Sequence, residues 1–189
     1  MSKVKFNLVG NTFTHLTNGN KGYSVHGKES KYIEWVGDDG KGTFYIDNTI
    51  NQGIVDKKDG PKYLWLLESR FIKPGLVESI IDNREAVEDA YETIFTHDQR
   101  LLALGDKYKW CPAQGFWIKD PKVYEKSKMI SMIASNKNMC EGHRLRLEWV
   151  DRIGDQLDLY GRGFKEIADK EEGLCDYMFS VAIENGQYE

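Results

Sequence analysis

KMISMIAS (128–135) and YMFSVAIEN (177–185) are the two stretches that decide the fold of this chain. Each is apolar on both faces over the length of a β-strand. LDLYG (157–161) adds a shorter strand that ends at a glycine. Strands of this kind, when they alternate with helices, indicate a parallel α/β sheet.

A helix is predicted between the strands over 128–135 and 157–161, from Gly142 onward. Its apolar residues fall on one helical face and are expected to pack in the core. They are Leu145, Trp149, Val150 and Ile153. This helix supplies the alternation that a parallel sheet needs.

Polar residues lie at or near the carboxyl ends of these strands, where open parallel sheets bind their ligands. They are Ser135-Asn136-Lys137, Arg146 in the first turns of the helix, and Glu184-Asn185. A planar guanidinium suits a diphosphate because it makes two charge-assisted hydrogen bonds. Arg146 is therefore a candidate phosphate ligand, with a surface salt bridge as the alternative. His143, at the helix start, is a second candidate donor to a phosphate.

The first part of the chain also alternates strands with helices, which indicates a second parallel sheet. Its strands are expected to end at Val9, Ile46, Leu67 and Thr96. Residues 31–36 fit either a strand or a helix, and residues 11–30 are predicted to form a long loop. We expect a Rossmann-like domain over 1–115, an aromatic connector over 116–127, and the start of a second Rossmann-like domain over 128–189.

Glu68 directly follows the apolar strand KYLWLL (62–67), at the edge where a ligand is expected. Leu67 and Phe71 would partly desolvate its carboxylate, which raises its affinity for a proton and suits general-base work. The alternative is a helix-capping or ion-paired acid, with Arg70 as the nearest partner. Asp98 is predicted to cap the helix that begins at residue 99.

Composition excludes several classes of protein. The 189 residues carry a net charge of −4, which argues against general nucleic-acid binding. No apolar run approaches the ~20 residues of a membrane span. The widely spaced Cys111, Cys140 and Cys175 form no metal pattern and suit free thiols in a reducing cytoplasm. Asp38-Asp39-Gly40 is interpreted as a turn rather than as an Asp-x-Asp metal motif.

Four motifs together resemble the donor domain of glycosyltransferase family ten, the α-1,3/1,4-fucosyltransferases. Their sequences look similar to those of family members encoded by marine phages and bacteria. They are Ser135-Asn136, Arg146-Leu-Glu-Trp-Val-Asp-Arg-Ile153, Asp158-Leu-Tyr-Gly161 and Tyr177-Met-Phe-Ser-Val-Ala-Ile-Glu-Asn185. The resemblance implies a GT-B fold, a GDP-fucose donor, a glycan acceptor, and inversion at the sugar carbon without a required metal or other cofactor.

The resemblance also implies roles for individual residues. Arg146 matches the arginine that contacts the donor diphosphate, and Glu184-Asn185 matches a Glu-Asn pair whose asparagine lines the donor site. Leu-Leu-Glu-Ser, which contains Glu68, looks like the position of the family's general base. Trp117 in the connector is a further candidate for lining a sugar site, although tryptophans are more often core residues.

The family motif continues through a tyrosine and a Thr-Glu-Lys triplet, which this chain, ending at Tyr188-Glu189, does not reach. The resemblance therefore implies an incomplete second domain, a parent protein that is an enzyme, and a chain that is inactive by itself. The strand over 177–185 would then have an open edge, through which the chain is expected to self-associate. The alternative is a non-catalytic glycan- or nucleotide-binding module that lacks the transfer machinery.

Overall fold

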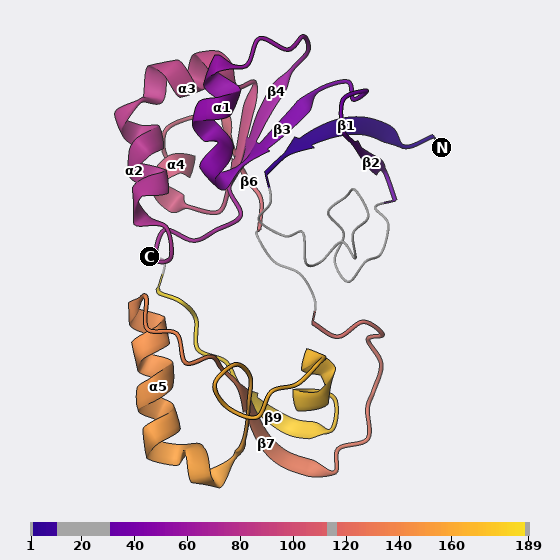
Figure 1. Ribbon diagram of the computed structural model, residues 1–189, viewed down its shortest axis with the longest axis vertical. Coiled ribbons are helices and arrows are strands. Elements are labelled where there is room, and N and C mark those ends of the chain that lie inside the picture. Colours follow the sequence, from indigo (N-terminus) through magenta and orange to yellow (C-terminus); the bar gives the residue numbers. More distant parts are fainter. Residues whose placement is uncertain (1, 11–30, 113–116, 188–189) are drawn as a thin grey trace. The chain divides into compact units, whose positions relative to one another are not determined.

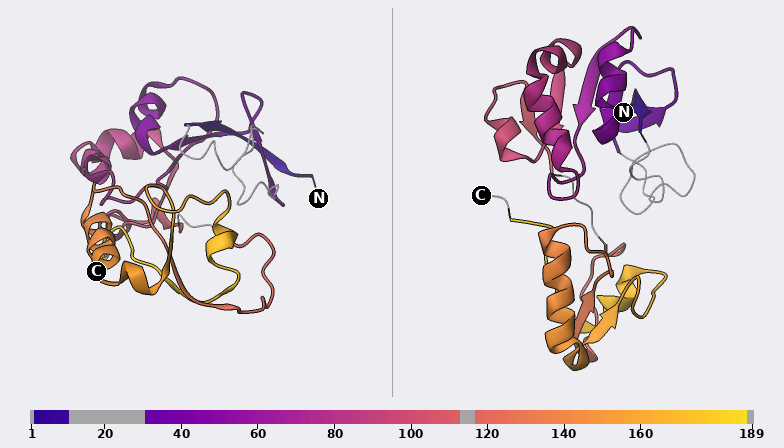
Figure 2. Two further views of the ribbon diagram at one scale, coloured as in Figure 1. Left: turned by 60° about the horizontal axis from the view of Figure 1, so that its bottom comes forward. Right: turned by 60° about the vertical axis from the view of Figure 1, so that its left-hand side comes forward.

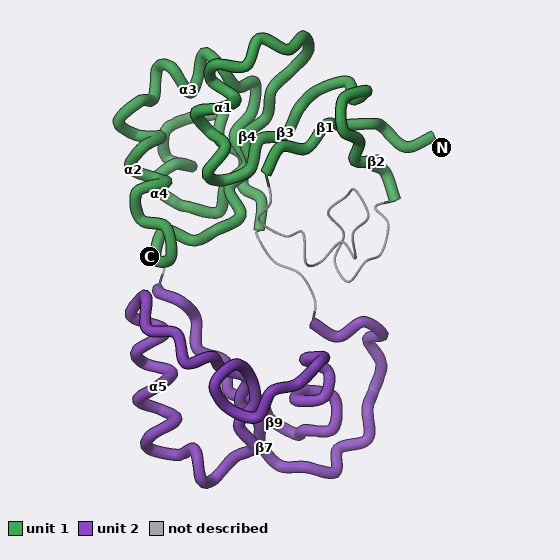
Figure 3. The backbone as a smooth tube through the Cα atoms, in the orientation of Figure 1, with its two compact units in different colours: residues 1–115, 188–189 green, residues 116–187 purple. Residues whose placement is uncertain are grey.

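A computed structural model describes residues 2–10, 31–112 and 117–187 of the chain (Figure 1). The chain divides into two compact units, residues 1–115 (unit 1) and residues 116–187 (unit 2) (Figure 3). Each unit has its own sheet, and both sheets are entirely parallel, so the predicted α/β class with two parallel sheets is confirmed. The predicted loop over 11–30 lies outside the described residues.

Unit 1 is built on a six-stranded sheet in the order β2-β1-β3-β4-β5-β6. Its strands are β1 (Val4–Val9), β2 (Ile33–Val36), β3 (Thr43–Ile46), β4 (Lys62–Trp65), β5 (Thr93–Thr96) and β6 (Tyr108–Trp110). The ambiguous segment over 31–36 is thus a strand. Because β1 has β2 on one side and β3 on the other, the strand order reverses at β1, and such a reversal is where open sheets bind ligands.

Helices cover the face of this sheet that carries the hydrophobic core (Figure 1). They are η3 (Asp47–Thr49), α1 (Ile50–Val55), α2 (Pro74–Asp82), α3 (Arg84–Ala90) and α4 (Gln99–Leu102). Tyr45, Leu64 and Ile94 point to them from the central strands and are fully buried. Pro74 stands in the first turn of α2, where its missing N–H costs no helical hydrogen bond.

The alternate residues of the same strands point to the other face, and most of them are aromatic. Phe44 is at the centre of this aromatic face: its ring stacks on Tyr63 at 4.8 Å and on Phe95 at 5.9 Å, and meets Phe6 edge-on at 5.3 Å. This pattern follows from the two-residue period of a strand. The sheet is therefore apolar on both faces, and its polar residues gather where the strands end.

Unit 2 has a three-stranded sheet in the order β8-β7-β9, with α5 and η5 on opposite sides of it (Figure 2). Its elements are β7 (Lys128–Ile133), α5 (Glu141–Ile153), η4 (Gly154–Gln156), β8 (Asp158–Tyr160), η5 (Lys170–Gly173) and β9 (Tyr177–Val181). Gly161 follows β8 with φ +111°, and a Cβ there would lie 1.9 Å from the carbonyl oxygen of Ala134. Only glycine fits this close approach.

Two expectations for unit 2 are wrong in detail. Leu145 and Trp149 of α5 are each 41% exposed rather than buried, because the helix turns Gly142 and His143 inward instead. The strand expected over 177–185 ends at Val181, because the following residues leave the sheet and hydrogen-bond to α5.

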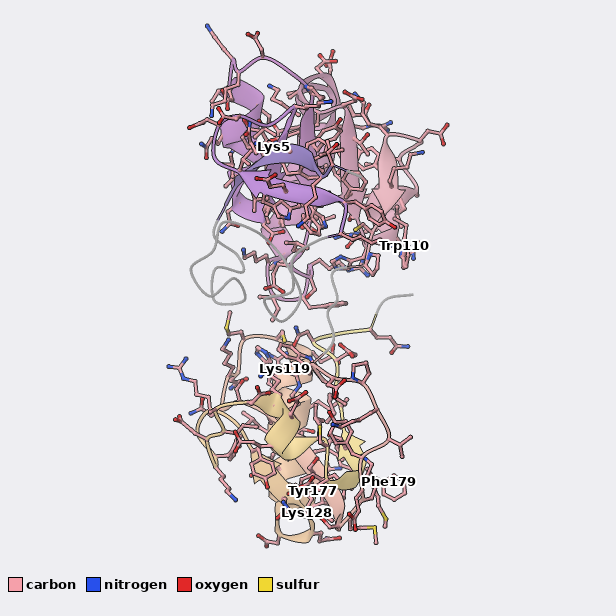
Figure 4. All side chains as sticks on the ribbon, turned by 90° about the vertical axis from the view of Figure 1, so that its right-hand side faces the viewer. Lys5, Trp110, Lys119, Lys128, Tyr177 and Phe179 are labelled. Atoms are coloured by element: carbon pink, nitrogen blue, oxygen red, sulfur yellow. The ribbon has the colours of Figure 1, made fainter. Side chains whose placement is uncertain are left out.

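Strand β9 pairs with β7 and with no other strand among the described residues. Met178 and Phe179 are 53% and 62% exposed on it. Tyr177 anchors the strand: its hydroxyl donates to Asp158 Oδ2 at 2.6 Å, and the ammonium of Lys128 lies 5.0 Å from its ring centroid (Figure 4). The outer edge of β9 and its exposed side chains are thus not covered by any described strand.

Candidate functional site

Three strands of unit 1 end side by side at its carboxyl edge. Ile46 of β3 pairs with Trp65 of β4, and Trp65 pairs with Phe95 of β5. The residues that follow these strands therefore share one edge of the sheet. Among them are Asp47 after β3 and Glu68 after β4.

Asp47 holds the backbone that leads into Glu68. It is fully buried, and its Oδ1 accepts hydrogen bonds from the amides of Leu67 at 2.8 Å and Glu68 at 3.2 Å. Its Oδ2 lies 3.9 Å from the ammonium of Lys73. Its φ of 42° is unusual for a residue other than glycine, and such strain persists where the surrounding structure fixes it. Asp47 therefore fixes the position of Glu68.

Asp47 was not among the candidate residues predicted from the sequence, in which Asp38-Asp39-Gly40 was interpreted as a turn. Asp38 is a surface residue that pairs with Lys58 at 2.8 Å. A signal for Asp47 was present, because it follows the apolar strand ending at Ile46 just as Glu68 follows the strand after it.

The carboxylate of Glu68 is partly buried and accepts one hydrogen bond, from the amide of Ser69 at 3.1 Å. No lysine or arginine in the described part of the chain lies within 4.0 Å of it. The alternative of an ion pair with Arg70 is therefore wrong. Most of the acceptor capacity of Glu68 remains available for a ligand hydroxyl.

Arg70 pairs instead with Asp98, at 3.1 Å from Oδ2 and 3.3 Å from Oδ1. Asp98 is only 3% exposed, and its Oδ1 also accepts from the amide of Arg100 at 3.0 Å. The prediction that Asp98 caps α4 is confirmed. The carboxylate of Asp98 is therefore used by the fold, whereas that of Glu68 accepts one described hydrogen bond.

The site residues of unit 2 meet at the start of α5. The amide of Gly142 donates to the carbonyl oxygen of Asn185 at 3.1 Å. A Cβ at Gly142 would lie 1.9 Å from the carbonyl oxygen of Glu184, so only glycine allows this approach. The segment after β9 is thus held against the first turns of the helix.

Arg146 lies one helical turn further and bonds to the same segment. Its Nε donates to the carbonyl oxygen of Ile183 at 2.7 Å, and its NH2 group donates to Oδ1 of Asn185 at 2.8 Å. The fold therefore brings together Arg146 and Asn185, which are 39 residues apart in the sequence. The side chain of Glu184 is exposed and joins neither of them.

His143, the second candidate donor to a phosphate, is buried at the start of α5. It is 5% exposed, and its Nδ1 accepts a hydrogen bond from the amide of Met139 at 3.2 Å. The side chain points back to the turn before the helix, so it stabilises the helix start.

Lys170 is a cation that was not among the candidate residues predicted from the sequence. It begins η5, and its ammonium lies 3.1 Å from the ring centroid of Trp117. Burial, and then the charge of Arg146, lower the pKa of Lys170 below its ordinary value. No pattern in the sequence pointed to it, because the acidic residues around it are typical of a solvated turn.

The described residues contain no group of three or more histidine, cysteine or acidic side chains that could hold a metal ion. Cys111, Cys140 and Cys175 are free. Burial raises the pKa of the Cys111 thiol, which makes it a poor nucleophile.

No protein-family model matches the chain, and no curated protein or solved structure matches it. Within residues 2–10, 31–112 and 117–187, none of the helices combines the length and the apolar character that crossing a bilayer requires.

Proposed function

We propose that the protein to which this chain belongs is a glycosyltransferase of GT-B type. It would transfer a sugar, fucose in our hypothesis, from a GDP-sugar to a glycan hydroxyl with inversion. One observation carries the proposal: the hydrogen bond from Arg146 to Asn185 joins two residues that the family resemblance assigns to one donor site. The parallel sheets and the carboxylate of Glu68 in the segment after β4 are compatible with it.

Glu68 is the proposed general base. It would remove the proton from the acceptor hydroxyl as that oxygen attacks the anomeric carbon of the donor sugar. Asp47 supports this role because it fixes the amides of Leu67 and Glu68. The carboxylate stands outside any described ion pair, so its lone pairs are free to accept the proton.

Arg146 is the proposed ligand of the departing diphosphate. A guanidinium has five N–H groups, and the bonds to Ile183 and Asn185 orient it while its NH1 end has no described acceptor. That end could donate to phosphate oxygens and balance the charge that builds on the leaving group.

Titration calorimetry with GDP tests the donor site. Replacing Arg146 with Met should weaken GDP binding by about tenfold or more, because a charge-assisted hydrogen bond is lost. Arg152→Met is the matched control, since Arg152 is an exposed arginine on the same helix. GDP affinity that is the same in wild type and Arg146→Met would overturn the proposal.

A module that binds the nucleotide without transferring the sugar is the second candidate. The observation that favours it is that the Arg146–Asn185 contact requires no catalytic group. GDP binding that depends on Arg146, together with an absence of transfer in the whole protein, would select this candidate.

Two further parts of the proposal concern the self-association of the protein and its location in the cell. Exposed Met178 and Phe179 on the outer strand β9 support self-association through residues 177–185.

Three free cysteines suit a reducing compartment, and we propose a cytoplasmic location.

A further inference from the structure

The two oxygens of the buried Asp47 carboxylate have different surroundings. Oδ1 accepts hydrogen bonds from the amides of Leu67 and Glu68, at 2.8 and 3.2 Å. Oδ2 is buried and accepts no hydrogen bond from the residues that the structure describes. Because a buried charge is costly unless it is paired and hydrogen-bonded, the position of this carboxylate depends on the group that faces Oδ2.

The group that faces Oδ2 is the ammonium of Lys73. The two atoms are 3.9 Å apart, which is within ion-pair distance but longer than a hydrogen bond. Among the described residues, no other lysine or arginine forms an ion pair with Asp47. The side chain of Asp47 is fully buried, so water and salt screen this pair less than a pair on the surface. Lys73 therefore supplies the positive charge that compensates the buried acid.

The backbone position of Lys73 is fixed by helix α2. Lys73 directly precedes this helix, and its amide donates to the carbonyl oxygen of Ser69 at 2.9 Å. The helix in turn buries Val77 and Ile80 in the core of unit 1. The point from which the ammonium reaches Asp47 is thus set by core packing.

Glu68 lies inside the loop that these contacts close. The loop runs from Leu67 to Lys73, and Asp47 contacts both of its ends: Oδ1 accepts from the first two amides, and Oδ2 faces the last side chain. Within the loop, the amide of Ser69 donates to Oε1 of Glu68 at 3.1 Å. The backbone of Glu68 is therefore held by one carboxylate, and that carboxylate is compensated by one described cation.

We propose that Lys73 is a positioning residue for Glu68, which it holds in place through the carboxylate of Asp47. Without the ammonium, Oδ2 would be buried with neither a hydrogen bond nor a cation, which is strongly unfavourable. The carboxylate would then turn toward water and withdraw Oδ1 from the amides of Leu67 and Glu68. The structural part of this inference rests on the contacts of unit 1 alone, whereas its consequence for sugar transfer rests on the proposed function.

Amide hydrogen exchange tests the structural part. Lys73→Met keeps an apolar stem and removes the charge, so it should lower the protection of the Leu67 and Glu68 amides about tenfold. The amide of Ile94 is the internal reference, because Ile94 is fully buried and its amide donates to the carbonyl oxygen of Lys107 at 2.9 Å. The protection of this amide should change less. Equal losses at all three amides would mean that Lys73 only supports the fold, and would overturn the inference.

Two further variants show whether Lys73 acts through its charge and through Asp47. Lys73→Arg keeps a cation and should retain most of the amide protection. In an Asp47→Asn background, Lys73→Met should have little further effect, because asparagine is neutral and needs no cation. An equally large effect in that background and in wild type would overturn the inference.

Lys58→Met is the matched control, because Lys58 pairs with the exposed Asp38 on the surface of the same unit. This variant should leave the protection of the Leu67 and Glu68 amides unchanged, since an exposed ion pair contributes little to stability. A loss of protection as large as that of Lys73→Met would show that any lysine of unit 1 has this effect, and would overturn the specific role of Lys73.

Initial rates of sugar transfer, measured on the protein that contains this chain, test the consequence for Glu68. Lys73→Met should lower kcat about tenfold, because a misplaced base removes the proton less efficiently. The KM for the acceptor and the affinity for GDP should stay near their wild-type values, and Lys73→Arg should retain most of the wild-type kcat.

The outcomes distinguish this inference from the proposed function. A kcat that falls in Glu68→Gln but not in Lys73→Met would keep the proposed function and overturn the positioning role. Reduced protection of the Leu67 and Glu68 amides in Lys73→Met, in a protein that transfers no sugar, would overturn the proposed function and support the contact from Lys73 through Asp47.

Discussion

The charged side chains of unit 1 and unit 2 are used in different ways. At the carboxyl edge of unit 1, cations and acids pair: Arg70 with Asp98, and Lys73 with Asp47. In unit 2, Arg146 bonds to neutral groups among the described residues, and Lys170 lies over a tryptophan ring. Paired buried charges serve the fold, because removing one partner leaves the other uncompensated. A cation that no acid neutralises can bind an anion, as the proposed role of Arg146 requires.

The largest effect is expected at Glu68, which forms no ion pair with a described residue at the carboxyl edge of unit 1. Glu68→Gln should lower sugar transfer at least ~100-fold, as expected for the loss of a general base, while GDP binding stays unchanged. Initial transfer rates from GDP-fucose to a glycan acceptor, measured on the protein that contains this chain, check this.

Glu92→Gln is the matched control, because Glu92 is exposed and stands just before β5, at the opposite end of the strand. It should leave transfer unchanged. Near-normal transfer by Glu68→Gln would remove Glu68 from the mechanism.

The second-largest effect is expected at Asp47, whose carboxylate accepts hydrogen bonds from the backbone amides of Leu67 and Glu68. Asp47→Ala should lower the free energy of unfolding by about 3 kcal/mol, because the amides of Leu67 and Glu68 lose their buried acceptor. Asp47→Gly should cost about 1 kcal/mol less, because glycine adopts a φ of 42° without strain. Urea unfolding of the variants measures both values.

Asp47→Asn is the control for the charge, since asparagine keeps an acceptor oxygen and tolerates positive φ. It should be the least destabilising of the three changes. Equal destabilisation by all three would show that the charge near Lys73, rather than the hydrogen bonds, is what matters.

A smaller difference should separate the two arginines that define the comparison. Arg70→Met should destabilise the protein by about 2 kcal/mol, because Asp98 stays buried with one cation fewer. Arg146→Met should cost at most about 1 kcal/mol, because its acceptors on Ile183 and Asn185 are neutral and partly exposed. Urea unfolding curves give both; an equal or larger loss at Arg146 would contradict the contrast.

The smallest effect is expected at the outer strand of unit 2. Wild type should self-associate at high concentration, and Phe179→Lys should weaken this association because a charge on an edge strand opposes pairing. Light scattering measures the mass, and Val123→Lys, an exposed position outside β9, is the control. A wild-type protein that stays monomeric at high concentration would contradict this prediction.

The elements of the fold were largely predictable because their signals are local. Apolar runs between glycine and polar turns marked the strands, and Pro74 marked the start of α2. Asp98 was identified as a cap from its place before a helix, and the structure confirms this contact. Glu68 was expected directly after a strand ending at Leu67, whereas β4 ends at Trp65, so Glu68 is the third residue beyond the strand.

The face that a helix turns to its sheet was not predictable from the same signals. The periodicity of α5 favoured Leu145 and Trp149 as core residues, yet both are 41% exposed. Packing of the helix is decided by Gly142, whose missing side chain admits the backbone of residues 184–185. That contact joins segments about forty residues apart, and a local pattern carries no information about it.

The sequence by itself determined the parallel α/β class, the order of strands and helices, and the candidate residues Glu68, Arg146 and Asn185. Only the tertiary structure decided which charges are compensated: Arg70 by Asp98, Asp47 by two amides and Lys73, and Lys170 by no described acid. Compensation depends on distances between residues that are remote in the sequence. Residue type alone gives the sign of a charge, whereas the fold sets its neighbours and its access to water, and these decide what the charge can do.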